Sequence, residues 1–257
     1  MATATMDSPP EQRRDWRRAF RAIGILIRDS ERTDQVFEIL DALEGPTNER
    51  GYHEFASHPD GRQLLDERPD LLATLSDHDS LARLPDGSFG RAYLAFMQEA
   101  GLSAQGLVDA ELDREGASQI ALDPDRRWLS DRGRDSHDLW HVLTGYGRDE
   151  AGESSLLAFT FANYPAWGVA LIVFFAMLIG PKTLQLRWER YLVQAWRRGR
   201  AAKLDFARYE QWLPEPLEEV RRRAGIIPPE EAHPGVGLIT GGRDSGASTG
   251  FFEGRTG

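Results

Sequence analysis

The sequence predicts an all-α fold, in which a single multi-helix domain spans residues 14–232. Apolar residues recur at spacings of three and four, Pro and Gly residues separate these stretches, and no stretch alternates as a strand would. A chain of 257 residues can bury a sizeable core. Residues 1–13 are polar and expected to be disordered, and the Gly/Ser-rich residues 233–257 are expected to form a flexible tail.

The first predicted helices lie between Asp15 and about Leu43, where a break near Asp29–Ser30 separates two helical stretches. A short helix is then expected from Gly61. Pro69 stops it, because a proline disfavours helical backbone at the residue before it.

The segment LPDGSFGRAYLAFMQEAGLS predicts the next helix more clearly. Ser88 or Asp86 can cap its start, and Gly101 stands where a C-terminal cap belongs. Its apolar residues follow i, i+4, i+7 and i+8, which is one face of a helix: Phe89, Tyr93, Phe96 and Met97. This face is expected to belong to the core.

A long uncharged stretch follows between Ser154 and Pro181. A helix over Ala166–Gly180 would be ~22 Å long at ~1.5 Å per residue, which is short of the ~30 Å hydrocarbon core of a bilayer. We therefore expect a buried helix, or one whose apolar face meets a membrane or lipid pocket, with a membrane anchor as the alternative. A further amphipathic helix carries Trp188 and Trp196, which suit a core or the face of a homodimer.

Composition narrows the function. The net charge of −10 argues against nucleic acid as a partner, since such proteins normally show a basic face. The chain has no cysteine, so any metal must be held by His, Asp, Glu and water. The N-terminal residues lack an apolar secretory segment, and a cytoplasmic location is expected.

The stretch HDLWHVLTGYGRDEAGE, residues 137–153, holds the candidate site. His137 and His141 are four residues apart and lie on one face of a helix, with Asp138 at its edge. On a straight helix Glu153 would lie ~18 Å beyond His141. Three glycines interrupt the helix, and if the chain reverses there Glu153 opens the next helix and faces the histidines.

Two imidazoles with one or two carboxylates suit Zn²⁺, and also Fe²⁺ or Mn²⁺. Water can complete the shell and leave a position open for a ligand. The alternative is a solvated helix face on which His141 is a hydrogen-bonded core residue. The pattern differs from the HExxH motif of zinc proteases, because no glutamate stands between the histidines.

Arginines lie just upstream of this stretch. Arg126 and Arg127 are expected on a solvated charged face. Arg132 and Arg134 run into the helix of the motif, and one of them is a candidate to hold a substrate carboxylate through two parallel hydrogen bonds.

Several segments resemble the ubiquinone (coenzyme Q) biosynthesis protein four family. They are HPDGRQLLDERPDL, LPDGSFGRAYLAFMQEAGLS, the motif of residues 137–153, and WRRGRAAKLDFARYEQWLPEPLEEVRRRAGI. Together they span roughly Asp15 to Ile227, and the motif agrees with the family signature at every ligand position. The uncharged SSLLAFTFANYPAWG and the Gly-rich tail depart from the family pattern.

The resemblance implies an all-helical fold and a divalent metal, usually zinc, with His137, Asp138, His141 and Glu153 as ligands. It also implies peripheral attachment to the inner face of the membrane that holds a polyprenylated aromatic substrate. The expected reaction is an oxidative decarboxylation that replaces the ring carboxylate of a prenylated 4-hydroxybenzoate with a hydroxyl. Other ubiquinone-biosynthesis proteins are the expected partners.

Two other functions stay open at this point. One is a non-catalytic, metal-stabilised scaffold that binds lipid and gathers the other ubiquinone enzymes. The second is a paralogue that acts on another isoprenoid lipid, which the departures from the family pattern suggest. Zn²⁺ is redox-inert, so either dioxygen attacks an activated phenolate directly or the working metal is iron or manganese.

Overall fold

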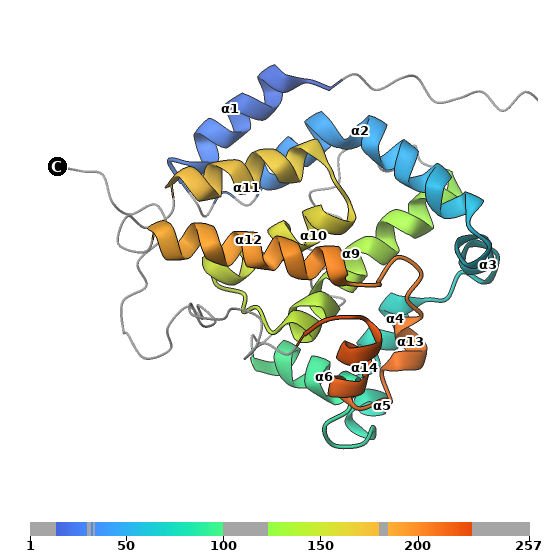
Figure 1. Cartoon of the computed structure of the whole chain (residues 1–257). Coiled ribbons are helices and arrows are strands. Elements are labelled where there is room, and N and C mark those ends of the chain that lie inside the picture. The colour runs from blue at the N-terminus through green and yellow to red at the C-terminus, as the bar shows by residue number, and fades with distance from the viewer. Residues whose placement is uncertain (1–13, 30–31, 33, 100–122, 180–184, 228–257) are drawn as a thin grey trace, which may run out of the picture.

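The computed structural model describes residues 14–29, 32, 34–99, 123–179 and 185–227 (Figure 1). These residues form helices and, apart from one isolated bridge, no β-structure, which confirms the all-α prediction. The predicted disordered residues 1–13, the tail of residues 233–257 and the Gly101 cap lie outside the described part. The helices are α1 (Trp16–Leu26), α2 (Asp34–Ser57), α3 (Pro59–Glu67), α4 (Leu71–Ser76), α5 (His78–Ala82), α6 (Phe89–Glu99), α9 (Pro124–Thr144), α10 (Glu150–Asn163), α11 (Trp167–Ile179), α12 (Gln185–Ala201), α13 (Tyr209–Trp212) and α14 (Leu217–Arg223).

The buried side chains form two clusters. The larger one joins α6, α9, α10 and α12 to the C-terminal helices α13 and α14, and Tyr93, Phe159 and Trp188 are among its largest fully buried members. The smaller one lies between α1, α2 and α11, which Figure 1 shows together on one side of the molecule. The candidate site lies beside the larger cluster, because His141 stands on α9 between the cluster members Trp140 and Val142.

The N-terminal helices follow the predicted pattern with different ends. The chain leaves α1 after Leu26 and starts α2 at Asp34, which confirms the expected break. The second helix runs on through Pro46 to Ser57, well past Leu43. A proline inside a helix is costly, and the contacts of α2 with α1, α3 and α11 offset this cost.

The predicted end of α3 and the predicted start of α6 hold closely. Arg68 ends α3 in the left-handed conformation, with φ of 42°, directly before Pro69. At the start of α6, the hydroxyl of Ser88 accepts a hydrogen bond from the backbone N–H of Arg91 at 3.3 Å. Ser88, and not Asp86, is therefore the cap. Asp86 pairs with the Arg91 side chain instead, at 3.2 Å.

The uncharged stretch forms most of α10 and all of α11, and α11 starts at Trp167, one residue later than predicted. The predicted end at Gly180 lies outside the described residues. The start of α11 packs tightly on α2, because a Cβ added at Gly168 would lie 3.0 Å from the Leu40 side chain. Phe174 and Leu178 remain more than half exposed. No helix of the described residues is long and apolar enough to cross a membrane.

Helix α12 packs so closely on α10 that Gly199 has no room for a side chain. A Cβ there would lie 2.2 Å from the carbonyl oxygen of Phe159. Trp188 is a core residue at 1% exposure, whereas Trp196 is 40% exposed. The predicted homodimer stays a prediction.

Substituting Gly199 with alanine is expected to lower the free energy of unfolding by about 1–3 kcal/mol, because the two helix backbones must separate. Urea denaturation measures the change. Gly51→Ala on α2 is the matched control, since a Cβ there meets nothing within 4 Å and alanine favours the helix. Equal effects of the two substitutions would contradict the packing argument.

Glu44 on α2 is a largely buried carboxyl group near Gly168, and it accepts a backbone hydrogen bond from Val169 at the start of α11. Burial raises the pKa of Glu44 from 4.5 to about 7, although this hydrogen bond opposes the shift. The folded state therefore binds this proton more tightly than the unfolded state does. Stability from the protonated form is fully present below pH 4.5 and is lost as the pH rises through 7.

Glu44→Gln is expected to stabilise the protein at alkaline pH by about 2–3 kcal/mol and to have little effect near pH 4. The amide keeps an acceptor for Val169 and carries no charge to bury. Melting temperatures between pH 4 and pH 9 measure the difference. Glu54→Gln, at a site 74% exposed on the same helix, should give no such pH dependence.

Candidate metal centre

The site is built on the pair of helices α9 and α10 and on the turn between them. Helix α9 ends at Gly145, whose left-handed φ of 74° lets its N–H donate to the carbonyl of His141 at 2.7 Å. Asp149 caps α10 by accepting from the backbone N–H groups of Ala151 and Gly152, each at 3.0 Å. The predicted chain reversal is confirmed.

Gly152 allows the reversal to be tight. A Cβ at this position would lie 1.9 Å from the carbonyl oxygen of Gly147, so any side chain would force the two backbone segments apart. Glu153 follows directly and lies in the first turn of α10. The close approach therefore sets where the carboxylate of Glu153 points.

The four predicted ligand side chains meet in one place. The possible ligand atoms of His137, Asp138 and His141 all lie within 4.8 Å of one another. One carboxylate oxygen of Glu153 lies 3.3 Å from Nε2 of His141, and the other lies 3.8 Å from Nε2 of His137. The predicted convergence is confirmed, and the role of these side chains as metal ligands stays a prediction.

His141 is oriented for ligation. Its side chain is fully buried, and its Nδ1 lies 3.1 Å from the carbonyl oxygen of Tyr146. A carbonyl only accepts, so Nδ1 carries the proton and Nε2 offers a lone pair. Among the described residues Nε2 has no hydrogen-bond partner, although it is shielded from solvent. An orphaned nitrogen beside a carboxylate fits a cation between them.

The electrostatics of the site favour the protonation states that a metal needs. Although the His137 side chain is 42% exposed, the protein around its ring excludes part of the water and lowers its pKa, which favours the neutral imidazole. Burial alone would raise the pKa of Glu153, but the nearby imidazoles of His141 and His137 lower it overall. A neutral imidazole and an ionised carboxylate are the ligand forms.

The structure does not bring Arg132 to the cluster. Its guanidinium is buried and pairs with Glu210 at 2.7 Å, and it also donates to the carbonyl of Ala207 at 2.8 Å. Arg132 thus joins α9 to the C-terminal segment, which argues against its predicted role with a substrate. Arg134 lies one turn before His137 and pairs with Asp131 and Asp135 at 3.0 and 2.9 Å.

The predicted solvated face at Arg126 is also more ordered than expected. Its side chain is 13% exposed, pairs with Glu49 on α2 and lies 3.9 Å over the ring of Tyr52. Arg127, at 44% exposure, is on the solvated face. The sequence does not reveal such a pair because its partner lies 77 residues away.

Arg148 is the charged residue that the sequence reasoning missed. It lies in the turn before α10, and its Nη2 donates to Asp138 at 3.1 Å. The same nitrogen lies 3.0 Å from the sulfur of Met97, and the guanidinium lies 4.0 Å over the ring of Phe96. That ring stacks on His141, with centroids 5.5 Å apart. Because the glycines return the chain to the histidines, a residue of the turn could have been expected there.

A second arginine closes the end of α9. Arg221 of α14 donates to the carbonyl oxygens of Leu143 and Val142, both at 2.9 Å. The last carbonyls of a helix lack partners within it, so this buried guanidinium replaces the solvent they would otherwise need. It fixes the helix end just after His141.

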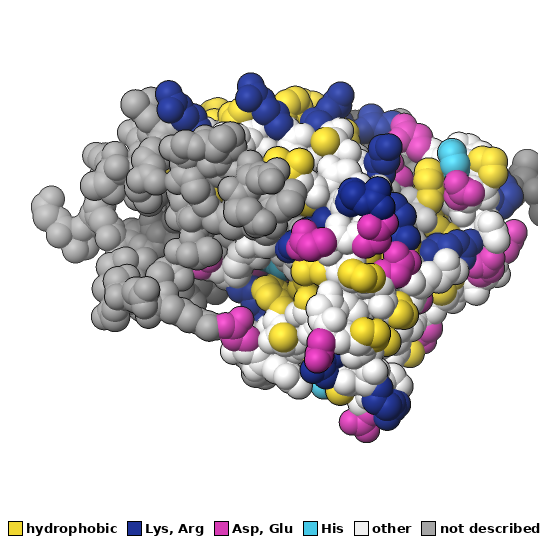
Figure 2. Space-filling view, turned by 60° about the horizontal axis from the view of Figure 1, so that its bottom comes forward, with side chains coloured by type: hydrophobic (Ala, Val, Ile, Leu, Met, Phe, Trp, Pro, Cys, Tyr) yellow, Lys and Arg dark blue, Asp and Glu magenta, His cyan; other side chains and the backbone are white. Residues whose placement is uncertain are grey.

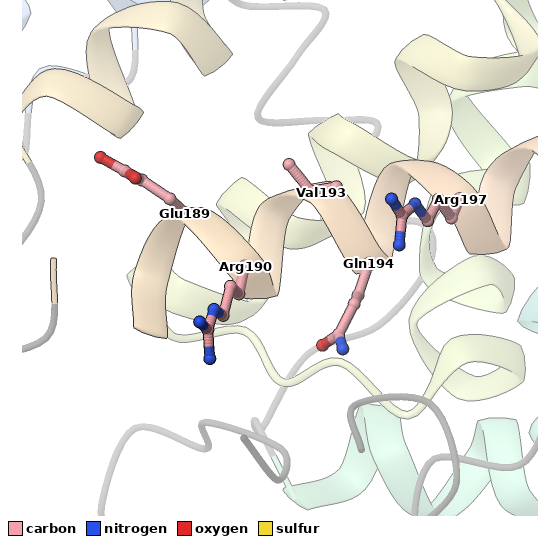
Figure 3. A pocket seen from close by; sticks show the side chains of 5 residues that line it. All are labelled: Glu189, Arg190, Val193, Gln194 and Arg197. Atoms are coloured by element: carbon pink, nitrogen blue, oxygen red, sulfur yellow. The ribbon is translucent and has the colours of Figure 1, made fainter. Parts of the chain in front are cut away.

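A hollow on the surface lies away from the site. It runs along the exposed side of α12 with a volume of about 480 Å³. Figure 3 shows its lining side chains, which point outward from one helix: Glu189, Arg190, Val193, Gln194 and Arg197. None of the predicted ligands lines it, so it is a separate surface feature.

The fold and the site together define a class of protein: an all-α chain with a His-Asp-His-Glu cluster, of the kind that holds a divalent metal, on a helix–turn–helix. Residues 18–230 match the family model described as Coenzyme Q (ubiquinone) biosynthesis protein Coq4. The chain belongs to this family of ubiquinone biosynthesis proteins.

Curated relatives agree. The chain is 28% identical over 214 residues to the mitochondrial ubiquinone biosynthesis protein COQ4 of Coprinopsis cinerea, which covers 80% of this chain and 69% of that protein. It is 31% identical over 176 residues to the mitochondrial COQ4 of Yarrowia lipolytica, covering 67% and 64%. For the Neurospora crassa protein the chain spans about half of the relative's length, 48%.

A solved structure supports the fold. A crystal structure from Nostoc punctiforme PCC 73102 superposes with a TM-score of 0.62 and covers 84% of this chain and 100% of that one. The two sequences are 23% identical. At this distance the likeness extends to the helical architecture and carries no conclusion about activity.

Proposed function

We propose that this chain works in ubiquinone biosynthesis as a metal-dependent enzyme that replaces the ring carboxylate of a prenylated 4-hydroxybenzoate with a hydroxyl group. The observation that carries the proposal is the convergence of His137, Asp138, His141 and Glu153. The buried Nε2 of His141 has no hydrogen-bond partner among the described residues and lies 3.3 Å from an oxygen of Glu153. Membership of the Coq4 family supports a role in ubiquinone biosynthesis.

The donor set fits a divalent ion. Imidazole nitrogen and carboxylate oxygen suit Zn²⁺ first, with Fe²⁺ and Mn²⁺ as alternatives. When bound, the ion would act as a Lewis acid toward a carboxylate or phenolate oxygen of the head group. His137 and Glu153 are each about two-fifths exposed, so a ligand has a side from which to approach.

The reaction is an oxidation and must be balanced by an oxidant. The acid, water and dioxygen give the phenol, carbon dioxide and hydrogen peroxide, so the ring carbon loses two electrons that dioxygen takes up. The bond from the ring to the carboxylate carbon breaks, and a bond from the ring to oxygen forms. Zn²⁺ does not change its oxidation state, so with zinc the dioxygen would react with the activated phenolate directly.

The isoprenoid chain needs apolar surface near the site. Helices α10 and α11 supply an uncharged stretch from Leu156 to Ile179, and α10 carries Glu153 at its start. Each CH₂ that leaves water is worth ~0.8 kcal/mol, so a prenyl tail can provide most of the binding energy. This leaves the polar cluster to orient the head group.

Turnover of a defined substrate tests the proposal. The purified chain, loaded in turn with Zn²⁺, Fe²⁺ and Mn²⁺, is incubated with a short-chain prenylated 4-hydroxybenzoate under air and under nitrogen. Release of carbon dioxide with formation of the hydroxylated ring, under air only, is expected. A metal-replete protein that never converts the acid with any of the three ions would overturn the enzymatic proposal.

A structural role for the metal is the second candidate, in a lipid-binding scaffold for other ubiquinone enzymes. The full burial of His141 favours it, since an ion there would also tie α9 to α10. His141→Ala separates the two functions. Loss of turnover with unchanged melting and lipid binding supports catalysis, whereas global unfolding supports the scaffold.

The membrane surface is the proposed location of the substrate, and α1 and α11 form the face proposed to meet it. Trp16 and Trp167 touch edge to face at 5.8 Å, and the apolar side chains that share this face are 38% to 59% exposed: Trp16, Phe20, Trp167, Phe174 and Leu178. Exposed Arg17 and Arg21 flank them on α1. Figure 2 shows basic side chains along the upper edge of the molecule with apolar ones between them. Aromatic and basic side chains together favour anionic lipid.

Sedimentation with vesicles of phosphatidylglycerol and phosphatidylcholine tests this face. Replacing both Phe20 and Phe174 with serine is expected to release most of the bound protein, since two exposed rings would no longer enter the interface. Val193→Ser, 39% exposed on α12, is the control and should bind as before. Unchanged binding of the double variant would exclude the face.

Other ubiquinone-biosynthesis proteins remain the proposed partners, and the inner face of a membrane the proposed place. The relatives are named mitochondrial, and the cytoplasmic location expected for this chain stays a prediction. If the chain acts on another isoprenoid lipid, that lipid and not the prenylated acid will co-purify with it.

A further inference from the structure

Arg148 stands beside the candidate metal centre with one side of its guanidinium unused. Its Nη2 donates to Asp138 at 3.1 Å and contacts Met97. Its Nη1 is shielded from solvent and has no hydrogen-bond partner among the residues that the structure describes. Arginine has five N–H donors and cannot lose its charge, so a single carboxylate leaves much of its hydrogen-bonding capacity unsatisfied.

The surroundings hold this guanidinium next to the cluster. Phe96 contacts both Arg148 and His141: the guanidinium lies 4.0 Å from the centre of its ring, and the imidazole stacks on the ring. The side chain of Arg148 is 22% exposed, so the group lies near the surface.

The charges of the site also call for an anion. The carboxylates of Asp138 and Glu153, the guanidinium of Arg148 and a divalent ion would leave one net positive charge among them. A ligand with one negative charge neutralises it. Without Arg148 the loaded site would already be neutral and would gain less from an anionic ligand.

We propose that Arg148 binds the carboxylate of an aromatic acid at the metal centre, and so selects the acid over its uncharged derivatives. This inference rests on the proposed function for the aromatic head group. It gives to Arg148 the role that the sequence assigned to Arg132 or Arg134. The arginine pairs with one side of the acid, while Asp138 keeps its position through the existing hydrogen bond.

The test compares an acid with its ester on the zinc-loaded full chain. The probes are 3-geranyl-4-hydroxybenzoate and its methyl ester, measured by calorimetric titration in a mild detergent. The wild type is expected to bind the acid more tightly. Arg148→Gln should weaken binding of the acid by ~10–100-fold, because charge-assisted hydrogen bonds are lost. Its affinity for the ester should stay unchanged.

Two further variants separate binding from positioning. Arg148→Lys keeps the positive charge but lacks the planar guanidinium, so it should lose part of the preference for the acid over the ester. It replaces Arg148→Gln as the probe if the glutamine variant does not fold. Arg127→Gln, an exposed arginine of the same helix–turn–helix, should behave as wild type. Zinc content is measured in each variant. If Arg148→Gln loses as much zinc as Asp138→Asn does, Arg148 serves only to hold Asp138.

The inference fails if the wild type binds acid and ester alike, or if Arg148→Gln keeps the preference of the wild type. It fails separately from the proposed function. If the zinc-loaded wild type prefers the acid but never decarboxylates it, the anion site is supported and the proposed enzymatic activity is overturned. If Arg148→Gln keeps its turnover with an unchanged KM, the proposed anion site is overturned and the proposed enzymatic activity is not.

Discussion

Replacing His141 with asparagine is expected to abolish stoichiometric zinc binding while the protein stays folded. The asparagine amide can donate to the carbonyl of Tyr146 as Nδ1 does, but nothing replaces Nε2 beside Glu153. Groups that merely orient a metal ligand are worth ~10–100-fold in affinity, so loss of a ligand should exceed that range. Zinc content after dialysis and the melting temperature without metal measure the two effects.

The matched control is His53→Asn, because His53 is 67% exposed on α2 and belongs to no cluster of possible ligands that the structure describes. It should retain one zinc ion per chain. A His141→Asn protein that also retains one equivalent, with wild-type affinity, would mean that the cluster is not the metal site.

Gly152→Ala is expected to have the second largest effect, on both stability and metal affinity. The added Cβ would lie 1.9 Å from the carbonyl oxygen of Gly147, so the turn must open and Glu153 must move with it. We expect a loss of about 1–3 kcal/mol in the free energy of unfolding. Zinc affinity should fall by ~10–100-fold, because the displaced carboxylate is itself unchanged but misplaced.

Gly133→Ala is the control for a glycine in the same helix–turn–helix. A Cβ there meets nothing within 4 Å, and alanine in a helix interior should stabilise by up to about 1 kcal/mol. If Gly152→Ala binds zinc as tightly as Gly133→Ala does, the tight turn does not position Glu153.

Local chemistry made most helices predictable. Arg68 ends α3 because Pro69 follows, and Ser88 caps α6 because a hydroxyl there can reach an N–H three residues on. The far end of α2 was not predictable in this way. Its continuation through Pro46 depends on packing against other helices, and such contacts lie far apart in the sequence.

In the candidate site, too, the features set by nearby residues were predictable, and those set by distant contacts were not. The turn after Thr144 was readable from its glycines, so the meeting of Glu153 with His141 followed from helix geometry. Arg132 and Glu210 form a pair across 78 residues, and no spacing reveals it. Arg148 was missed for another reason: its partners Asp138 and Phe96 show that a turn residue faces inward, which depends on side-chain direction and not on spacing.

The tight reversal at Gly152 has a consequence for how the centre is assembled. All four candidate ligands lie between residues 137 and 153, on two helices joined by a short turn. Closing so short a loop costs little chain entropy, and contacts local in sequence form early in folding. A nascent chain would present the complete ligand set before α12 to α14 are synthesised. Acquisition of the ion would then precede the arrival of Arg221, which closes the end of α9.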